Sequence, residues 1–250
     1  MALFDLLEAH QFDRVLVECE KRLRRDPDDM AAIGTAAAAL KALGRYEEAL
    51  PYYEKVGDYE KRDNVAVGRP GRQKDIACIH WMLGDKTLAT QSMTALVDGI
   101  LDGSINYGDI AGGVSQGLLL YYMGLTAGDE RAKTKALAYM RDRAKRSAIR
   151  MFPGPVARYY LDLIDFGDVL AAVTEKYGSV RDEAMALQLA STDLLRRRYL
   201  CVALFHDGIK ARARGDERYC MKRMRECFAL ENPLIEQEWY LARYEVELVS

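Results

Sequence analysis

The chain repeats a short pattern near its N-terminus. One copy begins at Phe12 and reads FDRVLVECEKRLRRDPDD, and a second begins at Tyr46 and reads YEEALPYYEKVGDYEKRD, so the two aromatic residues lie 34 positions apart. Val15 and Ala49 keep the same offset. A fixed period of this length is typical of architectures in which one helical hairpin stacks on the next. The repeat therefore favours a fold built from helix pairs.

Glycine residues mark the expected corners of these pairs. Gly44 stands at the first corner, and Gly-Asp pairs follow at Gly84, Gly128, Gly167 and Gly215. Glycine suits such corners because a helix commonly ends in a left-handed residue that glycine adopts without strain. The apolar residues recur at helical spacing, and alternation with period two is never sustained. We expect an all-α superhelical solenoid of antiparallel helix pairs, with about five or six units.

Residues 1–63 resemble the tetratricopeptide family, whose repeat has the 34-residue period seen here. The stretch DPDD at residues 26–29 falls where that repeat closes its second helix, because proline cannot continue a helix interior and acids suit the start of the next helix. Residues 64–250 are expected to form divergent helical pairs, with a break near residues 151–156 that contains two prolines. The whole chain, 1–250, is expected to be a single helical-repeat domain.

Composition and charge argue against several classes of protein. A net charge of -2 over 250 residues provides no field that would by itself recruit nucleic acid or an anionic membrane. No uncharged apolar run reaches the roughly 18 residues of a membrane span. The start of the chain, MALFDLLEAHQFD, lacks the basic region and cleavage site of a secretory signal. We expect a cytoplasmic protein, with no nucleic-acid or membrane partner.

Motifs that would support catalysis or metal binding are absent from the sequence. His10, His80 and His206 share no metal-ligand spacing, and the chain has neither a phosphate-binding loop nor a nucleophile elbow. The five cysteines include no Cys-x-x-Cys pair, and the spacing of Cys220 and Cys227 favours core packing on one helix face. We therefore expect no enzymatic activity, no metal and no cofactor.

Charged clusters are expected to be solvated helix faces. Basic clusters occupy residues 21–25, 141–146 and 196–198, each in or beside a helix that also carries acids. Aromatic residues are not interleaved with them in the pattern that stacking of single-stranded nucleic acid needs. Paired carboxylates such as Glu245 and Glu247 stand in charge-mixed helices. We therefore expect these charged residues to be solvated, and we assign no catalytic or nucleic-acid-binding site to them.

What remains is the binding of another protein. In helix-pair solenoids the first helix of each unit lines a concave groove, and the corner glycines fix which positions face it. Together with loop residues, the expected partner-binding set is Arg69, Lys74, Asp75, Trp81, Tyr107, Asp109, Tyr122, Arg158, Asp165, His206 and Arg212. A mixture of aromatic residues, arginine and charge pairs is typical of interface anchors. Core packing is an equal alternative for Trp81 and Tyr122.

Three segments within residues 68–245 carry a further similarity. They read GRPGRQKDIACIHWMLGD, VDGILDGSINYGDIAGGVSQGLLLYYMG and ENPLIEQEWYLARYE. They resemble segments of helical-repeat immunity proteins encoded beside bacterial polymorphic toxins of the Rhs and contact-dependent type. The resemblance implies a bacterial cytoplasmic protein that binds a cognate toxin domain and occludes its active site. The alternative is a cytoplasmic tetratricopeptide adaptor or scaffold that binds a peptide or protein partner, and the oligomeric state is left open.

Overall fold

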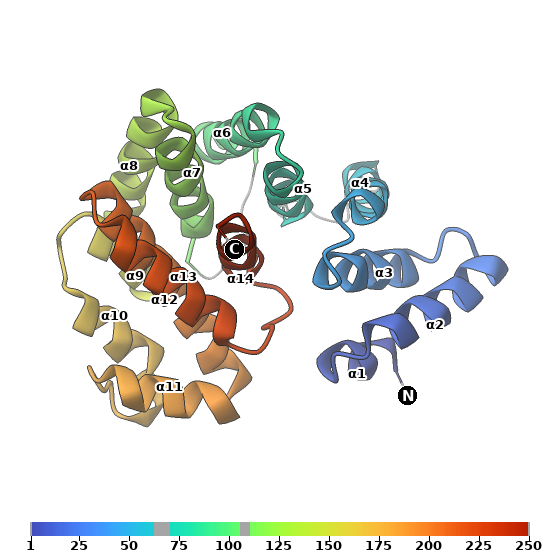
Figure 1. The fold of residues 1–250 in the computed structure, drawn as a ribbon. Helices are drawn as coiled ribbons and strands as arrows, with labels where there is room; N and C mark the ends of the chain where they lie inside the picture. Colours follow the sequence, from blue (N-terminus) through green and yellow to red (C-terminus); the bar gives the residue numbers. More distant parts are fainter. Residues whose placement is uncertain (1, 63–70, 106–110, 250) are drawn as a thin grey trace. The chain divides into compact units, whose positions relative to one another are not determined.

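The chain folds into helices throughout the part that the structure describes (Figure 1). The computed structural model describes residues 2–62, 71–105 and 111–249. Within these ranges every regular element is helical, with fourteen α-helices and two short 3-10 helices. This confirms the all-α expectation. Within the same ranges no helix combines the length and apolar character that crossing a bilayer requires.

The chain divides into two compact units, one up to Ser92 and one from Met93 onwards, and each is described separately. The helices of the first unit are α1 (Leu3–Glu8), α2 (Phe12–Arg25), α3 (Met30–Ala42), α4 (Tyr46–Arg62), α5 (Gly71–Met82) and the first part of α6 (Lys86–Asp102). In this unit α2 packs on α3, α3 on α4 and α4 on α5. From α1 to α5, each helix thus contacts the next one in the sequence.

The second unit is organised around α12. Its helices are the rest of α6, α7 (Val114–Ala127), α8 (Glu130–Ala144), η1 (Ser147–Arg150), α9 (Gly154–Tyr160), α10 (Phe166–Val173), η2 (Glu175–Tyr177), α11 (Glu183–Thr192), α12 (Leu194–Ala213), α13 (Glu217–Ala229) and α14 (Gln237–Glu247). Helix α12 contacts α7, α9, α10, α11, α13 and α14, and is buried along most of its length. The break predicted near residues 151–156 lies inside this unit, and the expectation of a single domain stays a prediction.

Four of the five predicted corners are confirmed. Left-handed backbone occurs at Gly44, Gly84, Gly128 and Gly215, with φ of 76°, 91°, 69° and 86°. At the last three, the following Asp85, Asp129 or Asp216 accepts a hydrogen bond from a backbone N–H in the first turn of the next helix, at 2.9 to 3.0 Å. The Gly-Asp pair therefore ends one helix and caps the next.

The corner predicted at Gly167 is wrong. Gly167 lies in the first turn of α10, where the carboxylate of Asp165 accepts from the backbone N–H of Asp168 at 3.0 Å. The Asp168 carboxylate accepts from the Asp165 N–H at 3.2 Å, which completes a capping box. The left-handed residue at this corner is Asp162, with φ of 55°. Here the Gly-Asp pair belongs to the first turn of α10, because the helix is already capped by Asp165, three residues before Asp168.

Candidate functional site

The predicted partner-binding residues fall into several environments. Arg69, Tyr107 and Asp109 lie outside the described residues. Lys74 is half-buried in the first turn of α5. Arg158 is half-buried on α9, and Asp165 is exposed at the start of α10, where it forms an ion pair of 2.6 Å with Arg181.

Trp81, Tyr122 and His206 have no exposed surface. The Tyr122 ring meets that of Phe205 edge-on, with 5.1 Å between centroids. His206 lies between the hydroxyl of Tyr160, 3.1 Å from Nδ1, and the carboxylate of Glu238, 3.3 Å from Nε2. These three predicted residues are therefore part of the protein core.

Asp75 forms a buried ion pair in the first unit. Its carboxylate accepts a hydrogen bond of 2.7 Å from the ammonium of Lys41, which is 1 % exposed. The two residues are 34 positions apart, the same offset as the sequence repeat. Burial opposes the charged form of Asp75, but the Lys41 ammonium outweighs it and holds the pKa of Asp75 below its usual value. The pair links α3 to α5.

We expect Asp75→Asn to lower the free energy of unfolding at pH 7 by about 2 kcal/mol, because the amide oxygen still accepts from Lys41 but no longer carries the charge that pairs with its buried ammonium. Since the pKa of Asp75 is lowered in the folded state, its stabilising contribution is present above the unfolded pKa of about 3.9 and is lost as the pH falls through the folded value. Urea unfolding between pH 7 and pH 3 should show the difference from wild type shrinking with acid. A difference that stays constant, or one matched by the exposed control Asp13→Asn, would contradict this account.

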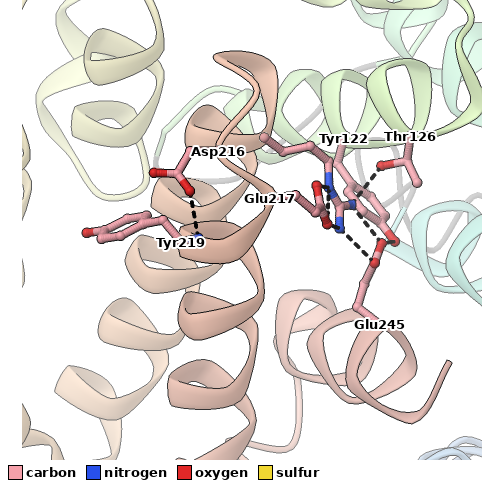
Figure 2. Close-up of polar contacts among 7 residues, drawn as sticks. Tyr122, Thr126, Asp216, Glu217, Tyr219 and Glu245 are labelled. Atoms are coloured by element: carbon pink, nitrogen blue, oxygen red, sulfur yellow. Dashed lines mark hydrogen bonds and ion pairs between the residues drawn. The ribbon is translucent and has the colours of Figure 1, made fainter. Parts of the chain in front are cut away.

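Arg212 on α12 joins four helices of the second unit through Thr126, Glu217 and Glu245, which are labelled in Figure 2. Its guanidinium donates to Glu217 on α13 at 2.7 Å, to Glu245 on α14 at 3.0 Å and to Thr126 on α7 at 3.3 Å. The hydroxyl of Tyr122 donates to the same Glu245 carboxylate at 2.8 Å. Burial opposes the charge, but the two carboxylates outweigh it and keep the pKa of Arg212 above its usual value. With 14 % of its side chain exposed, Arg212 is a structural link.

The expectation that Glu245 and Glu247 are both solvated is wrong for the first of them. Glu245 is 7 % exposed because it faces the guanidinium of Arg212. Glu247, two residues further along α14, is more than half exposed and pairs with Arg243 at 2.7 Å. Neighbouring carboxylates on one helix therefore have different roles.

A second buried network surrounds Asp207 on α12, which is 4 % exposed. Its carboxylate accepts hydrogen bonds from Tyr159 at 2.7 Å, Tyr219 at 2.9 Å and Nε of Arg223 at 2.8 Å. Arg223 also donates to Glu183 on α11 at 2.6 Å. Burial, together with the Asp207 charge, raises the pKa of Tyr219 to about 12. The network ties α9, α11 and α13 to α12.

Two arginines from the predicted solvated clusters are buried instead. Arg143 is 4 % exposed, and its guanidinium lies 5.0 Å from the centroid of the Tyr139 ring. Arg196 is 7 % exposed and donates to the carbonyl of Val173 at 2.6 Å. Arginine tolerates these positions because its planar head stacks on aromatic rings and is weakly hydrated.

An open groove lies on the first unit between α4 and the turn that joins α2 to α3. It has a volume of about 840 Å³ and is lined by Asp28, Met30, Pro51, Glu54, Lys55, Asp58 and Tyr59. An adjoining open depression of about 280 Å³ shares Pro51 and Lys55 and is otherwise lined by Leu23, Pro27, Ile33 and Tyr52. We call the larger space the first-unit groove and the smaller one the apolar pocket.

Local sequence explains why the groove forms. Helix α2 ends at Arg25 because Pro27 cannot continue it, and the turn then faces α4. The ammonium of Lys55 on α4 crosses to this turn, donating to the carbonyl of Pro27 at 2.8 Å and pairing with Asp28 at 3.0 Å. Lys55 thereby forms a wall shared by the groove and the pocket.

Sequence reasoning missed the groove because it assigned the binding surface to the first helix of each pair. Most groove residues instead lie on α4, the second helix of its pair. Pro51, Lys55, Asp58 and Tyr59 are spaced by four, seven and eight positions, which places them on one helix face. The sequence does show a proline within this helix and a helix face that combines acidic and aromatic residues. These two features could have indicated a binding surface on α4.

Comparisons with protein-family models and with curated proteins find no match for this chain. Among the described residues, no group of three or more histidines, cysteines or acids could hold a metal ion. In the described part of the chain, the first-unit groove is the surface that suits a binding partner.

Proposed function

We propose that the chain is a non-catalytic protein-binding module that engages its partner through the first-unit groove. The lining of the groove carries this proposal. In one open surface it combines three carboxylates, one ammonium group and the apolar bodies of Met30, Pro51 and Tyr59. Interfaces use such combinations, with an aromatic or aliphatic anchor surrounded by polar groups that exclude water.

The partner we propose is a cognate toxin domain, which the protein neutralises by occluding its active site. The resemblance of three segments to immunity proteins of polymorphic toxin systems supports this choice. A preorganised surface also suits the role, since a rigid binder loses little conformational entropy on association. The groove residues of α4 lie on a single helix of 17 residues.

A tetratricopeptide-like solenoid is part of the same proposal. The packing of α2 through α5 in sequence order supports it, as does the 34-residue separation of Lys41 and Asp75. In this arrangement the first-unit groove involves the second helix of a pair. The binding surface we propose therefore differs from the concave groove expected from the sequence.

Co-expression tests the proposed function. The toxin is the variable C-terminal domain encoded by the neighbouring upstream gene, produced from an inducible promoter in a host that lacks this protein. We expect the full chain to restore growth and to co-purify with the domain as a stable complex. Growth arrest that persists despite soluble expression of both proteins would reject the immunity proposal. A complex without rescue would favour the adaptor alternative.

A further inference from the structure

We propose that Cys201 and Cys227 are a redox-sensitive pair, which hydrogen peroxide converts into a disulfide bond that fixes α12 to α13. Both residues belong to the second unit, whereas the first-unit groove belongs to the first. The inference therefore does not rest on the proposed function.

The two sulfur atoms are in direct contact. Sγ of Cys201 on α12 lies 3.4 Å from Sγ of Cys227 on α13, and both residues are free thiols. A disulfide bond is about 2.0 Å long, so the two sulfurs need to approach each other by about 1.4 Å, a movement shared between two side chains. This contact between two thiols from different helices carries the inference.

The packing of α12 against α13 holds the thiols together. The two helices approach closely at Gly208, where an added Cβ would lie 2.9 Å from the Cβ of Arg223 and 3.2 Å from the carbonyl oxygen of Cys220. The thiol of Cys227 also donates a hydrogen bond of 3.4 Å to the carbonyl of Cys201. The sulfur of Cys227 is therefore directed toward α12 in the folded chain.

Burial makes the pair slow to react. Cys201 and Cys227 have no exposed surface. Burial, together with the hydrogen bond to Cys227, raises the pKa of the Cys201 thiol well above its usual value. Because the thiolate is the reactive form, we expect oxidation to be slow at neutral pH and faster in mild alkali. The oxidant must also be small enough to pass between packed helices, as hydrogen peroxide is.

The reaction consumes one peroxide for each disulfide. One sulfur attacks a peroxide oxygen, the O–O bond breaks, and a sulfenic acid forms while the other oxygen leaves as water. The second sulfur then attacks the sulfenic sulfur, so that the S–O bond breaks, the S–S bond forms and a second water leaves with the thiol proton. Two thiols are oxidised, and the peroxide is reduced to two water molecules.

Peptide mapping of the folded full chain tests the pair. The purified protein is treated with hydrogen peroxide in mild alkali without denaturant, the remaining thiols are alkylated in denaturant, and linked peptides are identified by mass spectrometry. We expect the link between Cys201 and Cys227 to be the main disulfide. Cys220 is the internal control, because it is equally buried on α13 and burial raises the pKa of its thiol to about 12, yet it contacts no other sulfur in the described chain.

Thermal unfolding measures how strongly the disulfide fixes the helices. It joins residues 26 positions apart, so oxidised wild type should melt roughly 5–10 °C higher than reduced wild type. Dithiothreitol should reverse this rise, whereas it does not reverse oxidation of methionine. Cys201→Ala should lose the rise, and the matched variant Cys220→Ala should keep it.

Three results would overturn the inference: no link between Cys201 and Cys227 in the folded chain, a link that forms only in denaturant, or an equal yield of links through Cys220. A link that leaves the melting temperature unchanged would overturn the claim that it fixes α12 to α13. None of these readouts involves a toxin domain, so failure of the proposed function leaves the inference standing, and its own failure leaves the proposed function standing.

Discussion

Asp207→Asn is expected to lower the free energy of unfolding by about 3–5 kcal/mol, as is typical when one partner of a buried ion pair is removed. The carboxylate of Asp207 accepts from Tyr159, Tyr219 and Arg223, and both Asp207 and Arg223 are 4 % exposed. An asparagine of the same size carries no charge and turns an N–H₂ group toward one of these donors. The Arg223 guanidinium would lose its most buried partner and keep only Glu183 and Glu226, whose side chains are about one third exposed.

Urea unfolding at pH 7 measures this effect, and Glu226→Gln is the matched control. Glu226 contacts the same guanidinium at 2.7 Å, but 32 % of its side chain is exposed. Its substitution should cost no more than about 1 kcal/mol, as for a solvated pair. Equal costs for the two variants would show that burial does not set the strength of the Asp207 network.

Arg212→Met is expected to have an effect of the same size, about 3–5 kcal/mol. It would leave Glu245 buried without its guanidinium partner and would remove the ion pairs that link α12 to α13 and α14. Replacing both partners, as Arg212→Met with Glu245→Leu, should cost clearly less than the sum of the two single variants, because no uncompensated charge remains buried.

A double-mutant cycle with thermal and urea unfolding measures this coupling. The control cycle uses Arg243→Met and Glu247→Leu, whose ion pair of 2.7 Å is partly exposed. That pair should show a coupling of about 0.2–1 kcal/mol. Additive losses for Arg212 and Glu245 would contradict the description of these residues as one buried unit.

The helices and most of their corners could be predicted because their causes are local. A left-handed glycine ends a helix and an aspartate caps the next one through contacts with residues only a few positions away. The corner at Gly84 and Asp85 can therefore be predicted from the sequence. The same reasoning failed at Gly167, because a Gly-Asp pair also fits the first turn of a helix that an earlier aspartate caps.

The burial of charged residues could not be predicted, because their partners lie far away in the sequence. Glu245 accepts from Tyr122, which is 123 positions earlier, and Asp207 accepts from Tyr159, which is 48 positions earlier. A single sequence gives no register between such distant helices. Arg212 therefore looked like a surface residue, although its side chain on α12 contacts α7, α13 and α14.

The first-unit groove lies between these two cases. The face of α4 that carries Pro51, Glu54 and Asp58 can be read from helical spacing. Its position against the turn at Pro27 depends on how α4 packs on α3, which spacing alone does not give. The residue types that line the groove can therefore be predicted from the sequence, but the place where the groove forms cannot.

Calorimetric titration of the purified toxin domain into the full chain tests the central claim, that the first-unit groove is the partner-binding surface. We predict that Glu54→Lys, Asp58→Lys weakens the affinity at least about 30-fold, which corresponds to about 2 kcal/mol. Its melting temperature should stay close to that of wild type. The control Asp13→Lys, Glu47→Lys changes the net charge equally at exposed positions outside the groove lining and should bind normally. A groove variant that folds and binds the toxin domain with wild-type affinity would contradict the account.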